Sequence, residues 1–447
     1  MRKYIFSIFM LFFTSILLAQ ETVLRLSMQE AIDYAIKNNY ENKIASKNIE
    51  GAKERKWERT TIGLPQINGK LDYQNWLKQQ VAFLPAEFTG GAPGTFQAIK
   101  FAPDQTMNAS VTLTQLIFDG SYLVGLQSAK TYLKISQQAK EKTEMATREA
   151  VINAYGNVLI TEKTIQILEN NLRVLKKNLF EAQKTYENGL MEQEKVEQLQ
   201  ITLGNVENNL RNAKRMSLIA YKMLNIALGN SIEKRLELSD TLDNLVASST
   251  NLDLLTYEFD VEKHIDFRMV ENERESKRLL MRLEQSKALP SLSAFVNYGA
   301  NSNANTFSFF DAKQRWFDYS LLGVSLNLPI FSSFGRQAKT ARAKIELENA
   351  DIRMEEARQK LNLQAEAAKS EYQLSICNYE TAKKNLGLAE RIEKKQQIKF
   401  FEGLSSSFDL LQSQNQLYTQ QNQYVQSMLN VIAKKVKLEN ALNISIK

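Results

Sequence analysis

The chain has 447 residues, and its few glycines (17) and prolines (6), with 24% charged residues, indicate long solvated helices rather than a loop-rich enzyme. Its formal net charge of +7 comes without a basic stripe interleaved with aromatic residues, which argues against nucleic-acid binding. One cysteine (Cys377) and one histidine (His264) exclude an internal disulfide and argue against a zinc cluster or a histidine-based catalytic triad. We therefore expect no metal and no cofactor, with His264 a solvated residue of a helix or loop.

Residues 1–19 have the pattern of a secretory signal peptide. Arg2 and Lys3 precede an apolar run, Ile5–Leu18, and Ala19 lies near a plausible cleavage point. The alternative, an N-terminal membrane anchor, is disfavoured because the run is too short to span a bilayer comfortably. No cysteine follows the run, so we expect an exported protein that is not a lipoprotein. No later stretch is apolar enough for a transmembrane helix, so the chain could enter a membrane only as strands.

Residues 26–60 have the apolar spacing of an amphipathic helix. Ser27, followed three residues later by Glu30, predicts a capping box at the start of this helix. The helix is expected to end before Leu64 and Pro65, where a new element begins.

From residue 66 the apolar period becomes two, which predicts a strand pair in 66–118, with a glycine-, proline- and phenylalanine-rich loop at 78–104. A second pair is predicted in 291–331. All four strands alternate apolar with small or polar residues over roughly ten residues, as strands of a membrane barrel do, and Trp76 and Trp316 suit an interfacial aromatic girdle. A soluble hairpin packed on helices alternates in the same way; the export signal favours the membrane.

Residues 121–229 are predicted to form a helical hairpin whose turn is Asn188–Leu190. Apolar residues on both arms repeat every 3.5 residues, which indicates a coiled-coil seam rather than a broad core-facing stripe. The outward arm is roughly 65 residues, or about 100 Å at 1.5 Å per residue. That length exceeds what a globular domain needs and indicates that the hairpin spans a distance.

The whole layout occurs twice. Tyr186–Leu190 matches Phe400–Leu404, and from this turn onward the offset between the halves stays constant. Each half reads helix, strand, strand, long helix and shorter helix, which gives a first repeat at 20–229 and a second at 256–447.

The second repeat contains a hairpin at 336–442 that corresponds to the first hairpin. In each hairpin the return helix is shorter than the outward helix. The leading helices (27–60 and 256–287) are about as long as this difference. We therefore expect leading and return helices to stack end to end beside each long helix. The intervening residues 230–255 would form an equatorial linker near mid-height. Because four strands cannot close a barrel and an open edge cannot face lipid, several copies must share one barrel.

These features resemble the TolC family of outer membrane efflux proteins. The resemblance rests on the duplicated layout, the Leu326–Phe331 strand-to-helix junction, the two Gly-Leu turns, and the Asp-Leu-Leu-x-x-Gln-x-x-Leu run at 409–417. It covers essentially the whole mature chain. It implies a homotrimer with one twelve-stranded β-barrel in the outer membrane, four strands per chain, continued into the periplasm by a long α-helical coiled-coil barrel.

The resemblance also implies a site at the hairpin tips. In this family, carboxylates just past the tip glycine help to close the channel. Asp409 occupies that place, the next position is Gln412, and the first hairpin carries Lys195 beside Glu194 instead. Alternatively, Asp409 simply starts a helix and favours its positive end. The family contact with a periplasmic adaptor lies at the tips, which makes candidates of six residues: Asn188, Gly189, Leu190, Glu402, Gly403 and Leu404.

The function expected from this sequence is a passive outer membrane duct of a tripartite efflux or type I secretion system. Its partners would be a periplasmic adaptor (membrane fusion) protein, an inner-membrane RND or ABC pump, and outer membrane lipid. The pump would supply the energy, since the sequence has no Walker-type nucleotide-binding motif. The alternatives are a periplasmic coiled-coil adaptor, which would need β-rich domains around one hairpin, and an enzyme, for which no credible nucleophile and base are present.

Overall fold

The computed structural model describes residues 23–444, so the predicted signal segment 1–19 lies outside the described residues. The described chain forms two compact units. The strand unit consists of Glu50–Ile135 and Asn272–Ile352, and the helical unit of residues 23–49, 136–271 and 353–444. Within 23–444, no helix combines the length and apolar character needed to cross a membrane.

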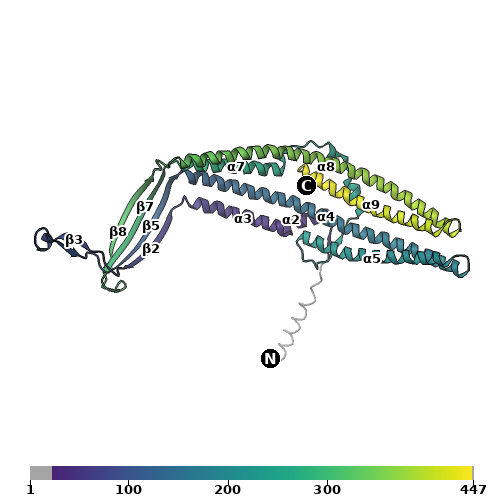
Figure 1. Cartoon of the computed structure of the whole chain (residues 1–447), viewed down its shortest axis with the longest axis horizontal. Helices are drawn as coiled ribbons and strands as arrows, with labels where there is room; N and C mark the ends of the chain where they lie inside the picture. The colour runs from purple at the N-terminus through teal and green to yellow at the C-terminus, as the bar shows by residue number, and fades with distance from the viewer. Residues whose placement is uncertain (1–22, 445–447) are drawn as a thin grey trace, which may run out of the picture. The chain divides into compact units, whose positions relative to one another are not determined.

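The predicted order of helix, strand, strand, long helix and shorter helix is present in both halves (Figure 1). In the first half the elements are α3 (Tyr40–Thr61), β2 (Gln66–Asn75), β5 (Gln105–Asp119), α4 (Gly120–Glu187) and α5 (Gln193–Leu228). In the second half they are α7 (Ile265–Ser286), β7 (Ser291–Ala304), β8 (Phe317–Asn327), α8 (Gly335–Phe401) and α9 (Ser407–Ala441). The long helices α4 and α8 have 68 and 67 residues, close to the predicted length.

In the strand unit, the four predicted strands form one antiparallel sheet in the order β2-β5-β7-β8. Ile67, Leu113, Val296 and Leu322 are cross-strand neighbours, so one apolar row crosses the whole sheet. All four side chains are exposed. On the opposite face, Asn297 Nδ2 donates to Thr112 Oγ1 at 2.6 Å. The sheet therefore has one apolar and one polar face, and neither edge strand has a partner within the described chain.

The loop at 78–104 is more ordered than the sequence suggested. It contains a small antiparallel ribbon of β3 (Ala82–Pro85) and β4 (Phe96–Ile99), joined through the short 3₁₀ helix η1 (Ala86–Thr89). Its glycine and proline content concealed this ribbon because those residues fall mostly in the turns, where Gly90 and Gly94 have positive φ.

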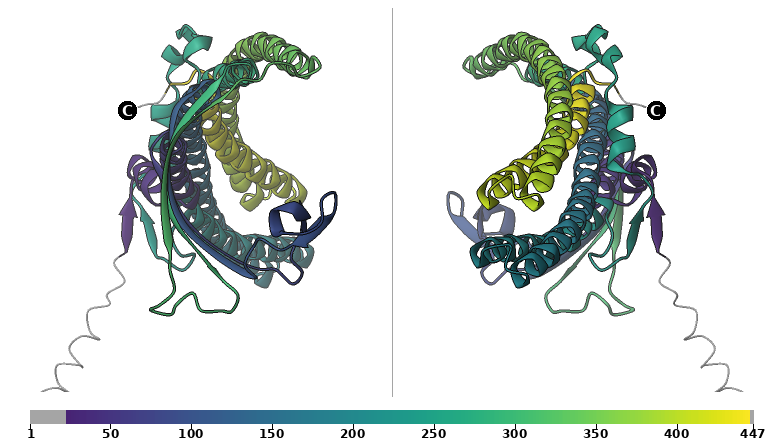
Figure 2. Two further views of the ribbon diagram at one scale, coloured as in Figure 1. Left: turned by 90° about the vertical axis from the view of Figure 1, so that its left-hand side faces the viewer. Right: turned by 90° about the vertical axis from the view of Figure 1, so that its right-hand side faces the viewer.

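In the helical unit, the predicted seam of α5 lies against its neighbours. The buried seam residues lie on one face of α5, which meets α4 and the adjoining helices. They are Val196, Leu199, Val206, Leu210 and Leu224. Figure 2 shows α9 running beside α4, and an ion pair between Arg148 and Glu439 joins the two helices.

The end-to-end stacking of leading and return helices is present in both repeats. At the start of α3, Asn39 Nδ2 donates to the carbonyl oxygen of Ala227, near the end of α5, at 2.8 Å. At the start of α7, the Ile265 N–H donates to Asn443 Oδ1, just past α9, at 3.1 Å. Each leading helix therefore begins at the place where the return helix of its repeat ends.

The first leading helix is not continuous, contrary to the prediction of one helix over 27–60. It breaks at Asn39 into α2 (Met28–Asn38) and α3. Asn39 has extended backbone angles because its side chain caps the start of α3 and the end of α5. Its oxygen accepts from the Glu41 N–H, and its amide nitrogen donates to the Ala227 carbonyl. The predicted capping box of Ser27 is confirmed at the start of α2.

The linker expected at 230–255 has its own structure. It contains β6 (Leu236–Leu238), which pairs in parallel with β1 (Leu24–Leu26), and α6 (Leu242–Ser249). The second leading helix was predicted to begin at 256 but begins at Ile265, because two 3₁₀ turns, η2 (Leu252–Thr256) and η3 (Val261–Lys263), intervene.

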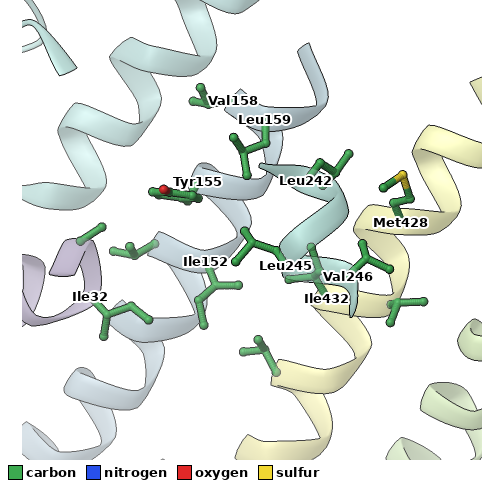
Figure 3. Close-up of a cluster of buried hydrophobic side chains, with 14 of the residues drawn as sticks. Ile32, Ile152, Tyr155, Val158, Leu159, Leu242, Leu245, Val246, Met428 and Ile432 are labelled. Atoms are coloured by element: carbon green, nitrogen blue, oxygen red, sulfur yellow. The ribbon is translucent and has the colours of Figure 1, made fainter. Parts of the chain in front are cut away.

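Two buried tyrosines fasten this linker to the long helices. Tyr155 of α4 donates to Asp240 Oδ2 at 3.0 Å, and Tyr372 of α8 donates to the Ser249 carbonyl at 2.6 Å. Leu242, Leu245 and Val246 of α6 pack between α4 and α9 (Figure 3). The linker is thus part of the main core of the helical unit.

His264 is buried, so the expectation of a solvated histidine was wrong. Its Nε2 lies 3.3 Å from the Asn440 carbonyl oxygen, and its Nδ1 accepts from the Asp266 N–H at 3.1 Å. Burial lowers its pKa. The sequence hid this because the charged neighbours of His264 project outward while its ring fills the junction between α7 and α9.

Candidate functional site

The two hairpin tips have the same backbone geometry. Gly189 and Gly403 have φ angles of 73° and 74°. The next residues close the helix ends, since the Leu190 N–H donates to the Thr185 carbonyl at 3.0 Å and the Leu404 N–H to the Lys399 carbonyl at 2.8 Å. This is the Schellman arrangement, in which a left-handed residue follows the helix. A Cβ atom at either glycine would meet nothing within 4 Å, so conformation and not space requires glycine here.

The residues around these glycines face outward. Leu190 and Leu404 are 80% and 74% exposed, although the residue at this place in a Schellman motif usually packs back onto its helix. Asn188 and Glu402 are exposed as well. The six residues predicted for partner contact therefore lie at accessible positions on two similar turns.

Asp409 starts α9, as the alternative interpretation proposed. Its carboxylate accepts from the Ser406 N–H at 3.1 Å and from the Ser406 hydroxyl at 2.6 Å, while the Asp409 N–H donates back to that hydroxyl at 3.2 Å. Hydrogen bonds from Ser406 lower the pKa of Asp409. The carboxylate is exposed and stays ionised into mildly acidic solution, so capping the helix leaves its charge available.

The other three predicted gate residues are not joined to Asp409. Gln412 is exposed one turn further along α9, and Glu194 is exposed on α5, where it accepts from Gln198 Nε2 at 3.1 Å. Lys195 is partly buried beside it. In residues 23–444 no hydrogen bond or ion pair links the pair on α5 with the pair on α9.

The tips are nevertheless held together by an apolar cluster that the sequence did not reveal. Ala182, Val196 and Leu199 of the first hairpin pack with Phe400 and Leu410 of the second. All five are buried. Because the cluster draws on four helices, movement of one tip has to carry the other with it or break these contacts.

Polar pairs further along the hairpins were also missed. Asn178 Oδ1 accepts from Gln397 Nε2 at 2.6 Å, and Asn171 Nδ2 donates to Gln421 Oε1 at 2.8 Å. Asn171 and Asn178 are buried and lie seven residues apart, so they occupy one heptad position on the face of α4 that meets the second hairpin. That spacing was the available signal. Burial also raises the pKa of Glu393, near these pairs.

The described residues hold no group of three or more histidine, cysteine, aspartate or glutamate side chains arranged to bind a metal ion.

The model of the outer membrane efflux protein family matches residues 63–230 and 261–443, one stretch in each repeat. The chain belongs to the outer membrane efflux protein family. No curated protein sequence matches this efflux protein. The family match confirms the resemblance deduced from the repeat and the Gly-Leu turns.

The fold of this efflux protein is similar to those of several solved structures. CusC, described as forming a transmembrane channel, aligns with a TM-score of 0.73 at 14% identity, covering 93% of this chain and 92% of that one. The outer membrane protein VceC of Vibrio cholerae gives 0.69 at 14% identity, covering 93% and 95%. The CmeC outer membrane channel of Campylobacter jejuni gives 0.71 at 16% identity, covering 93% and 85%. Family and fold together favour an outer membrane efflux channel over a periplasmic adaptor.

Proposed function

We propose that three copies of this chain form one duct, in which their sheets close a twelve-stranded barrel in the outer membrane and their helices line a passage through the periplasm. The observation that carries the proposal is the four-stranded sheet with an exposed apolar face and two edges, β2 and β8, that no other strand of residues 23–444 pairs with. In lipid, unpaired backbone groups at such edges are strongly unfavourable, so the edges must pair with those of other copies.

The strand directions suit this closure. Each strand of β2-β5-β7-β8 is antiparallel to its neighbour. Strand β8 of one copy therefore runs antiparallel to β2 of the next when copies are related by rotation. Repetition gives a barrel with an even number of strands and an unbroken antiparallel pattern, as in single-chain outer membrane barrels.

The helical tips would dock on a periplasmic adaptor that connects the duct to an inner-membrane RND or ABC pump. Leu190 and Leu404 support this role because they are large, apolar and exposed on turns of identical geometry. Residues 230–255 would lie as a belt around the duct, since hydrogen bonds from Tyr155 and Tyr372 attach them to both long helices.

The assembly is tested by extracting the full-length protein from isolated outer membranes with detergent and measuring its mass by light scattering with detergent correction. We expect a trimer that conducts ions when inserted in a planar bilayer. Recovery from the soluble fraction as a monomer without channel activity would contradict the duct.

We further propose that Asp409, with Gln412 beyond it, forms the narrowest ring at the tips. Three carboxylates around one axis attract cations and repel anions. Replacing Asp409 by Asn should reduce the cation preference of single channels several-fold at low salt, and much less at about 1 M salt, where the screening length is about 3 Å. Because its pKa is lowered, the wild-type preference should persist in mildly acidic buffer.

Ser406→Ala separates the two roles of Asp409. This variant loses the hydroxyl that accepts from the Asp409 N–H but keeps the carboxylate charge. It should destabilise the start of α9 and leave the ion preference in place. Asp409→Asn keeps an amide oxygen that can accept from Ser406 and removes the charge, so it should chiefly lower the ion preference. Glu194→Gln tests the first tip in the same way. Unchanged selectivity in Asp409→Asn would show that Asp409 only caps its helix.

A further inference from the structure

A cavity of about 810 Å³ lies within the strand unit where the sheet meets the helices. Its walls come from α3, α4 and α7, which lie together beside the strand ends (Figure 1). Most of the wall is apolar, including Ile62, Ile135, Leu279, Leu280 and Leu283. The volume falls in the range of pockets that enclose small organic molecules.

Small side chains on α4 create the hollow. Gly125, Ser128 and Ala129 follow one another on the face of α4 that lines the cavity, between longer residues of α3 and α7. A Cβ atom built on Gly125 would meet nothing within 4 Å. Glycine within a helix is about 1 kcal/mol less favourable than alanine, and no turn requires a glycine at position 125. What Gly125 provides is open space in the cavity.

The cavity opens on the polar face of the sheet. Its strand residues include Gln66 and Thr114, which are register partners, and Ser293. Thr114 is two residues from Thr112, which accepts the hydrogen bond of Asn297 on that face. If the apolar face meets lipid, the polar face meets the water inside the barrel, so the cavity faces the passage of the proposed duct.

The charge at the cavity is positive. Arg55 is in the cavity wall, and its guanidinium carbon lies 4.7 Å from the centre of the Tyr132 ring. Arg59 is exposed at the cavity and has no ion-pair partner among the described residues. The one carboxylate in the wall, that of Asp119, accepts from the backbone of Ser121 at 2.6 Å, and the charges of the two arginines outweigh it.

We propose that this cavity is a binding station for amphipathic organic anions passing through the duct, with the apolar body against α4 and α7 and the acidic group at Arg59. The inference rests on the proposed function, because it takes the polar face to be the inner one. It assigns a cargo class to the duct: molecules with an apolar ring system and one sulfonate, carboxylate or phosphate group.

The test uses the full-length trimer in lipid nanodiscs, with empty nanodiscs as the baseline. The probes are 1-anilinonaphthalene-8-sulfonate and the uncharged N-phenyl-1-naphthylamine, which share an apolar body and differ in charge. We expect saturable binding of the anion with one site per chain. Arg59→Gln should weaken it about fivefold, as for loss of an exposed ion pair, and should leave the uncharged probe unaffected. Gly125→Leu should abolish binding of both probes.

Arg211→Gln is the matched control, because Arg211 is an exposed arginine on α5 in the other unit. Equal weakening by Arg211→Gln and Arg59→Gln, or binding that survives Gly125→Leu, would overturn the site. The same samples are examined for trimer mass and conductance. A conducting trimer without saturable anion binding rejects this inference and leaves the duct intact, whereas a non-conducting monomer rejects the duct and with it the cargo role.

Discussion

Replacing Val324 by arginine should prevent much of the protein from assembling in the outer membrane. Val324 is exposed on the apolar face of β8, two residues from Leu322 in the row that crosses the sheet. An arginine on the lipid face near the middle of a bilayer costs roughly 2–4 kcal/mol. Three copies would carry this penalty in one barrel. We expect a large loss of trimer from the outer membrane fraction. For the trimer that remains, unfolding in lipid vesicles, measured by tryptophan fluorescence, should have a lower denaturant midpoint.

Ser325→Arg provides the matched control, since neighbouring residues of a strand point to opposite faces. Ser325 lies opposite Ser293 on the polar face. An arginine there would meet water in the barrel, so trimer yield should stay close to that of the wild type while single-channel selectivity changes. If both variants lose the trimer equally, the assignment of the two faces fails. If neither does, the sheet does not meet lipid.

The second large effect concerns the ion pair between Arg148 of α4 and Glu439 of α9. The Arg148 Nη2 atom lies 2.7 Å from Glu439 Oε2, and the Glu439 side chain is 1% exposed. The other carboxylate oxygen has no hydrogen-bond donor, and Lys435 Nζ lies 3.9 Å from it. Arg148→Met should leave this carboxylate buried without its main partner and lower the free energy of unfolding by about 3 kcal/mol or more.

The measurement is loss of helical circular dichroism with denaturant. The double variant Arg148→Met with Glu439→Met should recover most of the loss, because an apolar pair of similar volume can replace a buried ion pair. Lys214→Met is the control, since it removes a pair with Glu169 of similar length, 2.8 Å, between half-exposed side chains. It should change stability by at most about 1 kcal/mol. Equal effects of Arg148→Met and Lys214→Met would show that burial adds nothing to the first pair.

Local patterns in the sequence determined most of the fold. Strand and helix periods specify which face of each element is apolar, so the four strands and both hairpins could be placed before any contact was known. The turn glycines carried similar information, because the left-handed backbone at Gly189 and Gly403 is favourable for few other residues. The duplication then related the halves, and the sequence offered the helix-capping role of Asp409 as one of two interpretations, since a carboxylate near a helix start serves as a cap.

Contacts between distant segments were decided only by the tertiary structure. The break at Asn39 exists because its side chain reaches the end of α5, almost two hundred residues away in sequence. His264 reads as solvated from its charged neighbours, yet its ring is enclosed by the end of α9. The cavity beside Gly125 likewise depends on three helices meeting at one place. Periodicity tells which face of an element is apolar but not which distant element covers it, and these features depend on that choice of partner.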